Sequence, residues 1–148
     1  MEFIKNINAK ETFLVRHLVL REGKPIESCH FNGDDLETTV HFGYFIDCDL
    51  IGVVSLFNSK NTNFISENQF QIRGMAILPL FQKQGIGKKL VSHCEEFLQN
   101  KKDSLIWFNA REKAVSFYEK LHFIKIGEPF IIADIGVHYL MKKMICNE

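Results

Sequence analysis

The spacing of hydrophobic residues predicts three strands in the middle of the chain. From 39 to 47 hydrophobic and polar residues alternate, which is typical of a strand with two unlike faces. The hydrophobic face of that strand comprises Val40, Phe42, Tyr44 and Ile46. Residues 50–57 are almost continuously hydrophobic and predict a strand covered on both faces. A polar stretch over 58–67 predicts a hairpin loop before a strand at 69–78, so the three strands form an antiparallel meander.

Three other segments have the spacing of amphipathic helices. Asn8, with Glu11 three residues later, resembles a capping box and predicts a helix that runs to about Arg21. One face of this helix carries Phe13, Leu14, His17 and Leu18. The hydrophobic stripe of a second helix comprises Ile86, Leu90, Val91, Cys94, Phe97 and Leu98. Asn109 is placed to cap a third helix, with Glu112 at N3. The inner side of this helix comprises Ala114, Phe117, Tyr118 and Leu121.

The remaining segments complete a mixed α/β order. Residues 2–7 predict a short edge strand, and 22–38 predict a loop with one helical turn. Residues 105–108 predict a buried strand that is parallel to the preceding one, because a crossover helix joins them. The last strands are expected at 123–126 and 131–141, joined around Glu128-Pro129. The predicted order is β-α-βββ-α-β-α-ββ, and we expect residues 1–148 to form a single domain.

Composition narrows the class of protein. The formal net charge is zero, which argues against a general nucleic-acid binder. No hydrophobic run approaches the roughly 20 residues that span a bilayer, and the first residues lack a signal-peptide core, so we expect no membrane association. The four cysteines form no Cys-x-x-Cys pair and have no zinc-finger spacing. We therefore expect a cytoplasmic protein with reduced thiols and without a metal site.

The stretch from 81 to 89, Phe-Gln-Lys-Gln-Gly-Ile-Gly-Lys-Lys, carries the strongest chemical signal. It lies between a predicted strand and a predicted helix. The first N–H groups of a helix lack partners, and the helix dipole favours negative charge there. Gly85 and Gly87 allow the main chain to approach a ligand closely, and Lys88 and Lys89 add positive charge. This segment predicts a site for a phosphate or pyrophosphate.

Two common phosphate-binding motifs fit this stretch poorly. A Walker A loop requires Gly where Gln82 stands and Ser or Thr where Lys89 stands. A Rossmann motif requires a third Gly where Leu90 stands, and no second mononucleotide half follows it.

A third pattern fits better. The residues from Gln82 to Gly87 read as Gln/Arg-x-x-Gly-x-Gly/Ala, which resembles the acyl-CoA pyrophosphate loop of the GNAT superfamily of N-acetyltransferases. Downstream, 109–123 is similar to the superfamily's Asn-x-x-Ala…Phe-Tyr-Glu-Lys-x-Gly-Phe segment, with His122 where Gly is usual. The resemblance covers about 69–143, and the first half of the chain shares only the element order.

The resemblance implies where an acyl-CoA would be held and which group would act as the acid. The implied pyrophosphate contacts are Gln82, Gln84, Gly85, Gly87, Lys88 and Lys89. The implied contacts of the pantetheine arm are the main chain of Ala76, Ile77 and Leu78 and the side chain of Asn109. In the superfamily, the two parallel strands that flank the arm splay apart beside it. Tyr118 stands where the superfamily has a tyrosine that protonates the leaving thiolate. A phenol of pKa ~10 is well matched to that proton transfer.

The sequence leaves the base and the acceptor open. An amine with a pKa above ~9 has to lose a proton before it attacks, either to a side chain or to water. The candidate bases are His41, His30, His138, Glu37 and Glu67. His138 and His41 are the candidate substrate contacts, and His138 shares the side of Leu140 if that leucine faces the core. The first helix and the loop at 22–38 are expected to shape the acceptor pocket, but their charged residues are of mixed sign.

The resemblance predicts an enzyme of the acyltransferase class. It would move an acetyl group from acetyl-CoA to a primary amine, on a small molecule or a peptide, by direct attack in a ternary complex. Cys94, on a hydrophobic helical stripe, is expected to be a buried inert thiol rather than an acyl carrier. An acyl-CoA-binding sensor without catalysis and a nucleotide-binding protein are the alternatives. Whether the protein is a monomer or a homodimer is not readable from the sequence.

Overall fold

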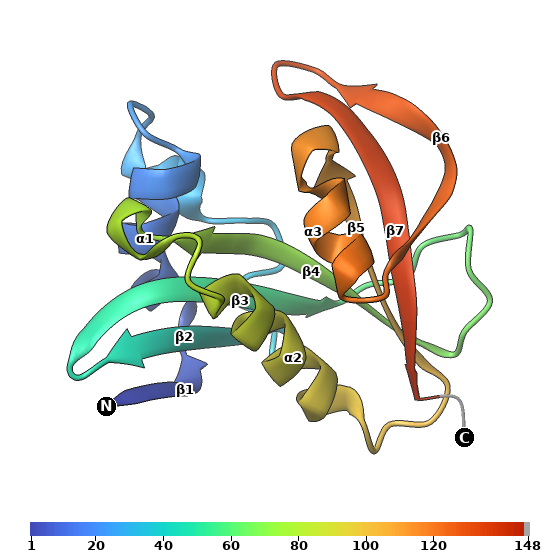
Figure 1. Cartoon of the computed structure of the whole chain (residues 1–148), viewed down its shortest axis with the longest axis horizontal. Helices are drawn as coiled ribbons and strands as arrows, with labels where there is room; N and C mark the ends of the chain where they lie inside the picture. Colours follow the sequence, from blue (N-terminus) through green and yellow to red (C-terminus); the bar gives the residue numbers. More distant parts are fainter. Residues whose placement is uncertain (147–148) are drawn as a thin grey trace. The chain divides into compact units, whose positions relative to one another are not determined.

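The computed structural model describes residues 1–146 and has the predicted element order (Figure 1). Seven strands form one mixed sheet in the order β1-β2-β3-β4-β5-β7-β6. The strands are β1 (Glu2–Ile7), β2 (Val40–Ile46), β3 (Asp49–Asn58), β4 (Asn68–Ile77), β5 (Ser104–Arg111), β6 (Ile124–Ile132) and β7 (Gly136–Cys146). The helices are α1 (Ala9–Leu20), α2 (Ile86–Leu98) and α3 (Val115–Lys120). Short 3-10 turns are η1 (Ile26–Cys29), η2 (Pro79–Phe81) and η3 (Glu112–Ala114). The predicted α/β class is confirmed.

Contacts along the chain gather into two compact units, and each is described by itself. The first unit consists of 1–58 and 72–97, and the second consists of 59–71 and the chain from Leu98 onward. Strand β4 contributes to both, because its first residues belong to the second unit and its last residues to the first. Within residues 1–146, no helix is long and apolar enough to cross a membrane.

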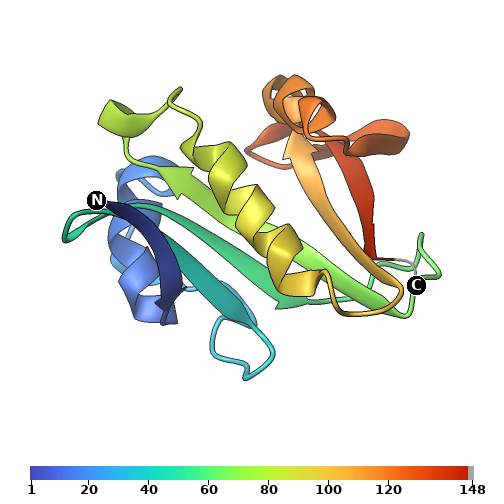
Figure 2. The same cartoon turned by 60° about the horizontal axis from the view of Figure 1, so that its bottom comes forward.

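The first unit is a sheet covered on both faces. Strands β1 and β2 pair antiparallel, as do β2 and β3, and β1 lies at the edge as predicted. Helix α1 covers one face, and α2 crosses the other (Figure 2). The core on the α1 side comprises Ile7, Val15, Phe45, Val53 and Ala76. On the α2 side, the ring of Phe42 lies 4.6 Å from His93 and 5.6 Å from Phe97. Strands β2 and β3 are therefore both buried on two faces; this was predicted for β3 only.

Helix α1 begins with the predicted capping box but buries a different face from the one that its hydrophobic residues indicate. The side chain of Asn8 accepts from the N–H of Glu11 at 2.9 Å, and the side chain of Glu11 accepts from the N–H of Asn8 at 2.9 Å. Leu14 and Leu18 are 66% and 48% exposed. The buried residues are Ala9, Thr12, Val15 and Arg16. The hydroxyl of Thr12 and the two terminal nitrogens of Arg16 form hydrogen bonds inside the protein, so polar residues occupy the buried side, and hydrophobic spacing alone misplaces it.

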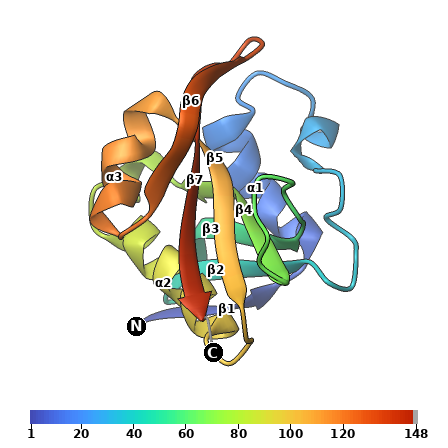
Figure 3. The same ribbon diagram turned by 90° about the vertical axis from the view of Figure 1, so that its right-hand side faces the viewer.

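The second unit is built around β7, which pairs antiparallel with β5 on one side and β6 on the other (Figure 3). Residues 68–71 of β4 pair with 104–107 of β5 in the predicted parallel direction. Successive residues of β5 face opposite sides. Phe108 packs on the α3 side, where its ring lies 4.9 Å from Phe123. Trp107 packs on the other side in a core with Leu105 and Leu140.

The predicted N-cap at Asn109 is wrong. Strand β5 runs on to Arg111, and Asn109 is paired with Leu140 of β7 inside the ladder. Glu112, expected at N3, is instead the first residue of η3, and α3 begins only at Val115. The ladder with β7 takes up the main-chain groups of this segment, so the strand continues past the residue that the sequence indicates as a helix start.

The predicted junction of the last two strands is also wrong. Strand β6 continues through Glu128-Pro129, and the turn to β7 lies around Asp134, whose φ is +66°. The β6–β7 register shifts between Ile126 and Phe130. A bulge on an edge strand accepts a proline, which has no N–H to donate, and Gly127 supplies a φ of +74° there. The Gly-Glu-Pro sequence therefore marks a bulge rather than a turn.

Candidate active site

The turn between β4 and α2 is held by two glutamine side chains. Nε2 of Gln82 donates to the carbonyl of Ile77 at 2.9 Å, and Nε2 of Gln84 donates to the carbonyl of Leu80 at 3.2 Å. Gly85 has a φ of +84°, and the position of its missing Cβ is open space. Gly85 thus adopts this conformation without strain and leaves the main chain accessible to a ligand.

The start of α2 supplies main-chain donors. The N–H of Lys89 bonds to the carbonyl of Gly85 at 3.2 Å, and the N–H of Gln82 bonds to the carbonyl of Pro79 at 3.4 Å. The N–H groups of the first helical turn, including those of Gly87 and Lys88, have no intrahelical partner by geometry. Of the predicted pyrophosphate contacts, Gly87 and Lys88 therefore lie where helix N–H groups are left for an anion, whereas Lys89 and Gln82 bond within the turn.

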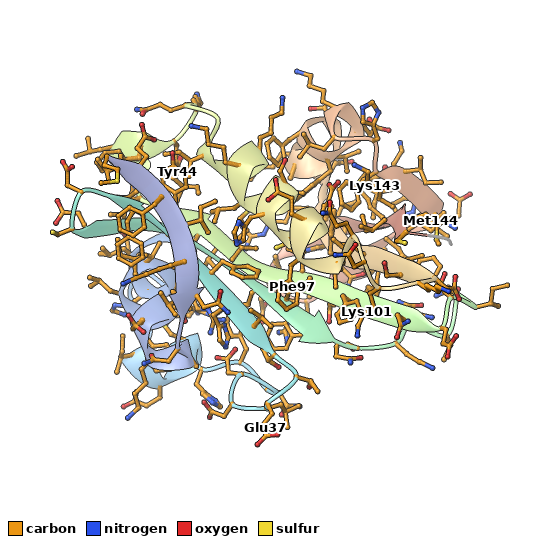
Figure 4. The ribbon with its side chains drawn as sticks, turned by 90° about the horizontal axis from the view of Figure 1, so that it is seen from below. Glu37, Tyr44, Phe97, Lys101, Lys143 and Met144 are labelled. Atoms are coloured by element: carbon orange, nitrogen blue, oxygen red, sulfur yellow. The ribbon has the colours of Figure 1, made fainter. Side chains whose placement is uncertain are left out.

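The side chain of Lys89 is also tied to the protein. Its Nζ lies 3.3 Å from the hydroxyl of Tyr44 and 3.9 Å from Oε1 of Glu2, and Tyr44 itself donates to Glu2. Figure 4 labels Tyr44 in the first unit. The hydrogen bond with Tyr44 raises the pKa of Lys89. These groups line a pocket of about 680 Å³ together with Phe3, Ile4, Gly85, Lys88, Ser92, His93 and Glu96. Lys88 forms no hydrogen bond or ion pair within residues 1–146, so its charge is left for a ligand at this turn.

The end of β4 holds the three residues predicted to meet the pantetheine arm. Ala76 is buried in the core on the α1 side. The N–H of Leu78 donates to the carbonyl of Ile51 in β3 at 2.9 Å, and the carbonyl of Ile77 accepts from Gln82. Leu78 is therefore fixed to β3, and its N–H is not available to a ligand.

Tyr118 lies on α3 in a cluster of aromatic rings. Its ring centroid is 4.2 Å from Phe108, 5.0 Å from Phe117 and 6.0 Å from Phe123. The side chain is only partly buried. Packing on three sides fixes the ring and thereby the position of the hydroxyl at its end.

Asn109 faces the opposite side of β5 from Tyr118. Phe108, the preceding residue, makes the contact with Tyr118, so the exposed Asn109 points away from α3. Asn109 lines a pocket of about 370 Å³ with Asn61, Asn63, Ile126, Gly127, Glu128, Phe130 and Leu140. The structure thus does not bring Asn109 and Tyr118 together.

His138 lies on the same side as Asn109. It pairs with Arg111 of β5 in the ladder, two positions from the pair formed by Leu140 and Asn109. His138 and Leu140 are both buried on this side, as predicted. Nδ1 of His138 lies 2.8 Å from the carbonyl of Gly136 and donates to it, because a carbonyl only accepts. The neutral ring then carries its lone pair on Nε2, which has no partner within the described part of the chain.

His41, the other candidate substrate contact, is buried and has partners for both ring nitrogens. It is 4% exposed, with Nδ1 2.6 Å from Oγ of Ser55 and Nε2 3.0 Å from the carbonyl of Asp34. Both ring nitrogens are used inside the first unit. This histidine therefore supports the buried network around Asp34 and presents no nitrogen to a substrate.

That network, which the sequence did not reveal, centres on a buried ion pair. Arg16 and Asp34 are joined by two hydrogen bonds, Nη1–Oδ2 at 2.6 Å and Nη2–Oδ1 at 3.1 Å, and neither side chain is exposed. Burial alone would raise the pKa of Asp34, but the bonds from Arg16 and from the N–H of Phe31 hold it below its ordinary value. The one sequence signal for this burial was that Arg16 follows Ala9, Thr12 and Val15 at helical spacing.

The thiol of Cys94 is not placed to act as a nucleophile. Its side chain is fully buried, and burial raises the pKa of the thiol far above its ordinary value. No cluster of three or more His, Cys, Asp or Glu residues within 1–146 is arranged to hold a metal ion.

Comparison with known proteins gives one consistent result. The sequence model of the Acetyltransferase (GNAT) family matches residues 4–123. An uncharacterized N-acetyltransferase of Bacillus subtilis (strain 168), YitI, is 33% identical over 142 residues, which are 96% of this chain and 95% of that protein.

Solved structures agree in fold. The ribosomal-protein-S18-alanine N-acetyltransferase from Escherichia coli superposes with a TM-score of 0.79 at 15% identity, covering 100% of this chain and 96% of that one. An aminoglycoside 6′-N-acetyltransferase complexed with coenzyme A gives 0.77 at 14% identity, covering 99% and 98%.

Proposed function

The chain belongs to the GNAT family of acetyltransferases, and we propose that it transfers an acetyl group from acetyl-CoA to a primary amine. The observation that carries the proposal is the glycine turn at the start of α2. Gly85 and Gly87, with Lys88, combine free helix N–H groups, an open main chain and an uncommitted cation. This chemistry suits a diphosphate, and a structural neighbour was solved in complex with coenzyme A.

In this proposal the turn holds the cofactor and the end of β4 orients its arm. The pyrophosphate lies against the N–H groups of Gly87 and Lys88, with Gln84 and Gly85 shaping the approach. The main chain of Ala76 and Ile77 meets the pantetheine. Because Leu78 is bonded to Ile51, we assign it the role of fixing this strand end.

The reaction we propose is direct attack by the amine nitrogen on the thioester carbonyl. The carbon–nitrogen bond forms, the carbon–sulfur bond breaks, the nitrogen loses one proton and the sulfur gains one. Tyr118 donates the proton to sulfur, and water accepts the proton from nitrogen. His138 lies on the opposite side of the β5–β7 ladder from Tyr118, so we do not assign it as the base for a nitrogen that attacks the same carbon. Asn109 lies on the side of His138, and we assign both residues to a part of the acceptor away from the reacting nitrogen, rather than to the cofactor.

The test is a kinetic assay with both substrates varied. We expect acetyl-CoA to be consumed only with an amine present, an acetylated amine to be detected by mass spectrometry, and reciprocal plots to intersect, as for a ternary complex. Parallel plots would indicate an acyl-enzyme and contradict direct attack. Binding of CoA without any acetylated product across a broad amine panel would favour the acyl-CoA sensor instead.

A further inference from the structure

Three arginines surround one aromatic ring in the first unit. The guanidinium carbons of Arg16, Arg21 and Arg73 lie 3.9, 5.2 and 5.0 Å from the ring centroid of Phe31. We call these three residues the arginine cluster. Arg73 also lies 5.3 Å from the ring of Phe57. Stacking on aromatic faces accommodates the guanidinium planes but does not neutralise their charge.

One carboxylate, that of Asp34, lies beside the arginine cluster and pairs with Arg16. Asp34 bonds to both terminal nitrogens of Arg16, which also donates to the carbonyl of Cys29 and to Ser55. Nε of Arg16 is buried without a hydrogen-bond partner. Among the side chains of residues 1–146, only that of Arg16 forms hydrogen bonds with the carboxylate of Asp34, and Asp34 acts on Arg73 only through its charge, so one carboxylate faces three guanidinium groups.

Neither Arg21 nor Arg73 has a carboxylate partner in the described part of the chain. Arg21 donates to the carbonyl of Leu20 at 3.1 Å. Arg73 forms no hydrogen bond or ion pair there, although it is half-buried, and burial lowers its pKa. The nearby Asp35 is already bonded to His30 at 2.8 Å. Burying a guanidinium without a hydrogen-bonded counter-charge costs free energy. Such a group is therefore a candidate for binding an anion.

The cluster also has a defined place in the chain. Arg73 precedes Ala76 by three residues on β4, about 10 Å along a strand. Between them, Gly74 has a φ of +65°, and a Cβ there would come within 2.9 Å of Phe31. Glycine at this position thus lets β4 approach Phe31. Arg21 lies at the start of the 22–38 loop, which we expect to shape the acceptor pocket.

We propose that Arg21 and Arg73 bind a carboxylate carried by the acceptor amine. The substrate class would then be amino carboxylates, such as amino acids or peptides with an acidic group near the reacting amine. The planar fork of a guanidinium matches a carboxylate, as the Arg16–Asp34 pair illustrates. This inference rests on the proposed acetyltransferase function and adds its substrate class.

The test uses pairs of amines that differ only in the carboxylate, such as lysine and 1,5-diaminopentane. We expect kcat/KM to be about 10- to 100-fold higher for the carboxylate member, as charge-assisted hydrogen bonds are typically worth. Arg73→Gln and, independently, Arg21→Gln should bring the ratio of the two kcat/KM values toward one by raising KM for the carboxylate-bearing amine. Arg73→Lys should retain part of it, and the affinity of Arg73→Gln for CoA should stay that of the wild type.

Lys24→Gln is the matched control, because Lys24 is an exposed cation on the same loop and lies outside the arginine cluster. It should leave the ratio unchanged. Equal use of both members of each pair, or a preference for a phosphate-bearing amine, would overturn the inference and leave the acetyltransferase intact. If no amine is acetylated, the proposed function fails, and calorimetric binding of the same pairs to the CoA-loaded protein still decides the inference.

Discussion

Replacing Tyr118 by phenylalanine is expected to lower kcat about 100-fold, the lower end of what a positioned general acid contributes. The variant removes one hydroxyl and keeps the ring, so the 4.2 Å contact with Phe108 and the rest of the aromatic cluster persist. Without the phenol, the thiolate leaves unprotonated. KM for acetyl-CoA should change little, because the pyrophosphate turn is untouched.

Steady-state kinetics with both substrates saturating measures this effect. Tyr139→Phe is the matched control, because Tyr139 is also partly buried but lies on β7 beside Lys125. It should retain wild-type kcat. A Tyr118→Phe enzyme with unchanged kcat would remove the acid role of Tyr118 and leave proton delivery to solvent.

The second large effect is on stability. Asp34→Asn is expected to lower the free energy of unfolding by about 3–5 kcal/mol, because it leaves the fully buried Arg16 without its counter-charge. For a chain of this size, that corresponds to roughly 6–20 °C in Tm. Thermal unfolding followed by circular dichroism measures it.

Asp35→Asn provides the control on the neighbouring residue. Its carboxylate pairs with His30 with a side chain that is 76% exposed, so its loss should cost less than about 1 kcal/mol. Equal losses for the two variants would show that the buried pair contributes no more than an exposed one.

The same pair predicts an acid-dependent loss of stability. The folded-state pKa of Asp34 is lower than its unfolded value of about 3.9, so its contribution is complete above that value. It should decline as the pH falls from about 4 through the folded-state pKa. The Asp34→Asn protein should lack this part of the pH dependence.

The sequence predicted the order of elements well because each strand and helix has its own local signal. Capping at Asn8, strand β2 and the glycine turn before α2 depend on neighbouring residues, and each was found at the expected position, although β2 is buried on both faces. The end of β5 and the β6–β7 turn were not found at the expected positions. Pairing with β7, whose residues are distant in the sequence, determines both.

The charges of α1 and the following loop show most clearly what a sequence lacks. Read along the chain, Arg16, Arg21, Asp34 and Asp35 are a neutral mixture that favours no acceptor. In the structure Asp34 pairs with Arg16, and Asp35 pairs with His30. Only the three-dimensional pairing leaves Arg21 unbalanced, beside an Arg73 that comes from a distant strand.

The central claim is that the glycine turn holds the pyrophosphate of CoA, and amide NMR tests it most directly. Titration with CoA should shift the amide signals of 84–88 in a saturable manner, while pantetheine, which lacks the pyrophosphate, should leave them in place. If these signals stay unchanged at millimolar CoA, the turn does not bind the cofactor and the central claim is contradicted.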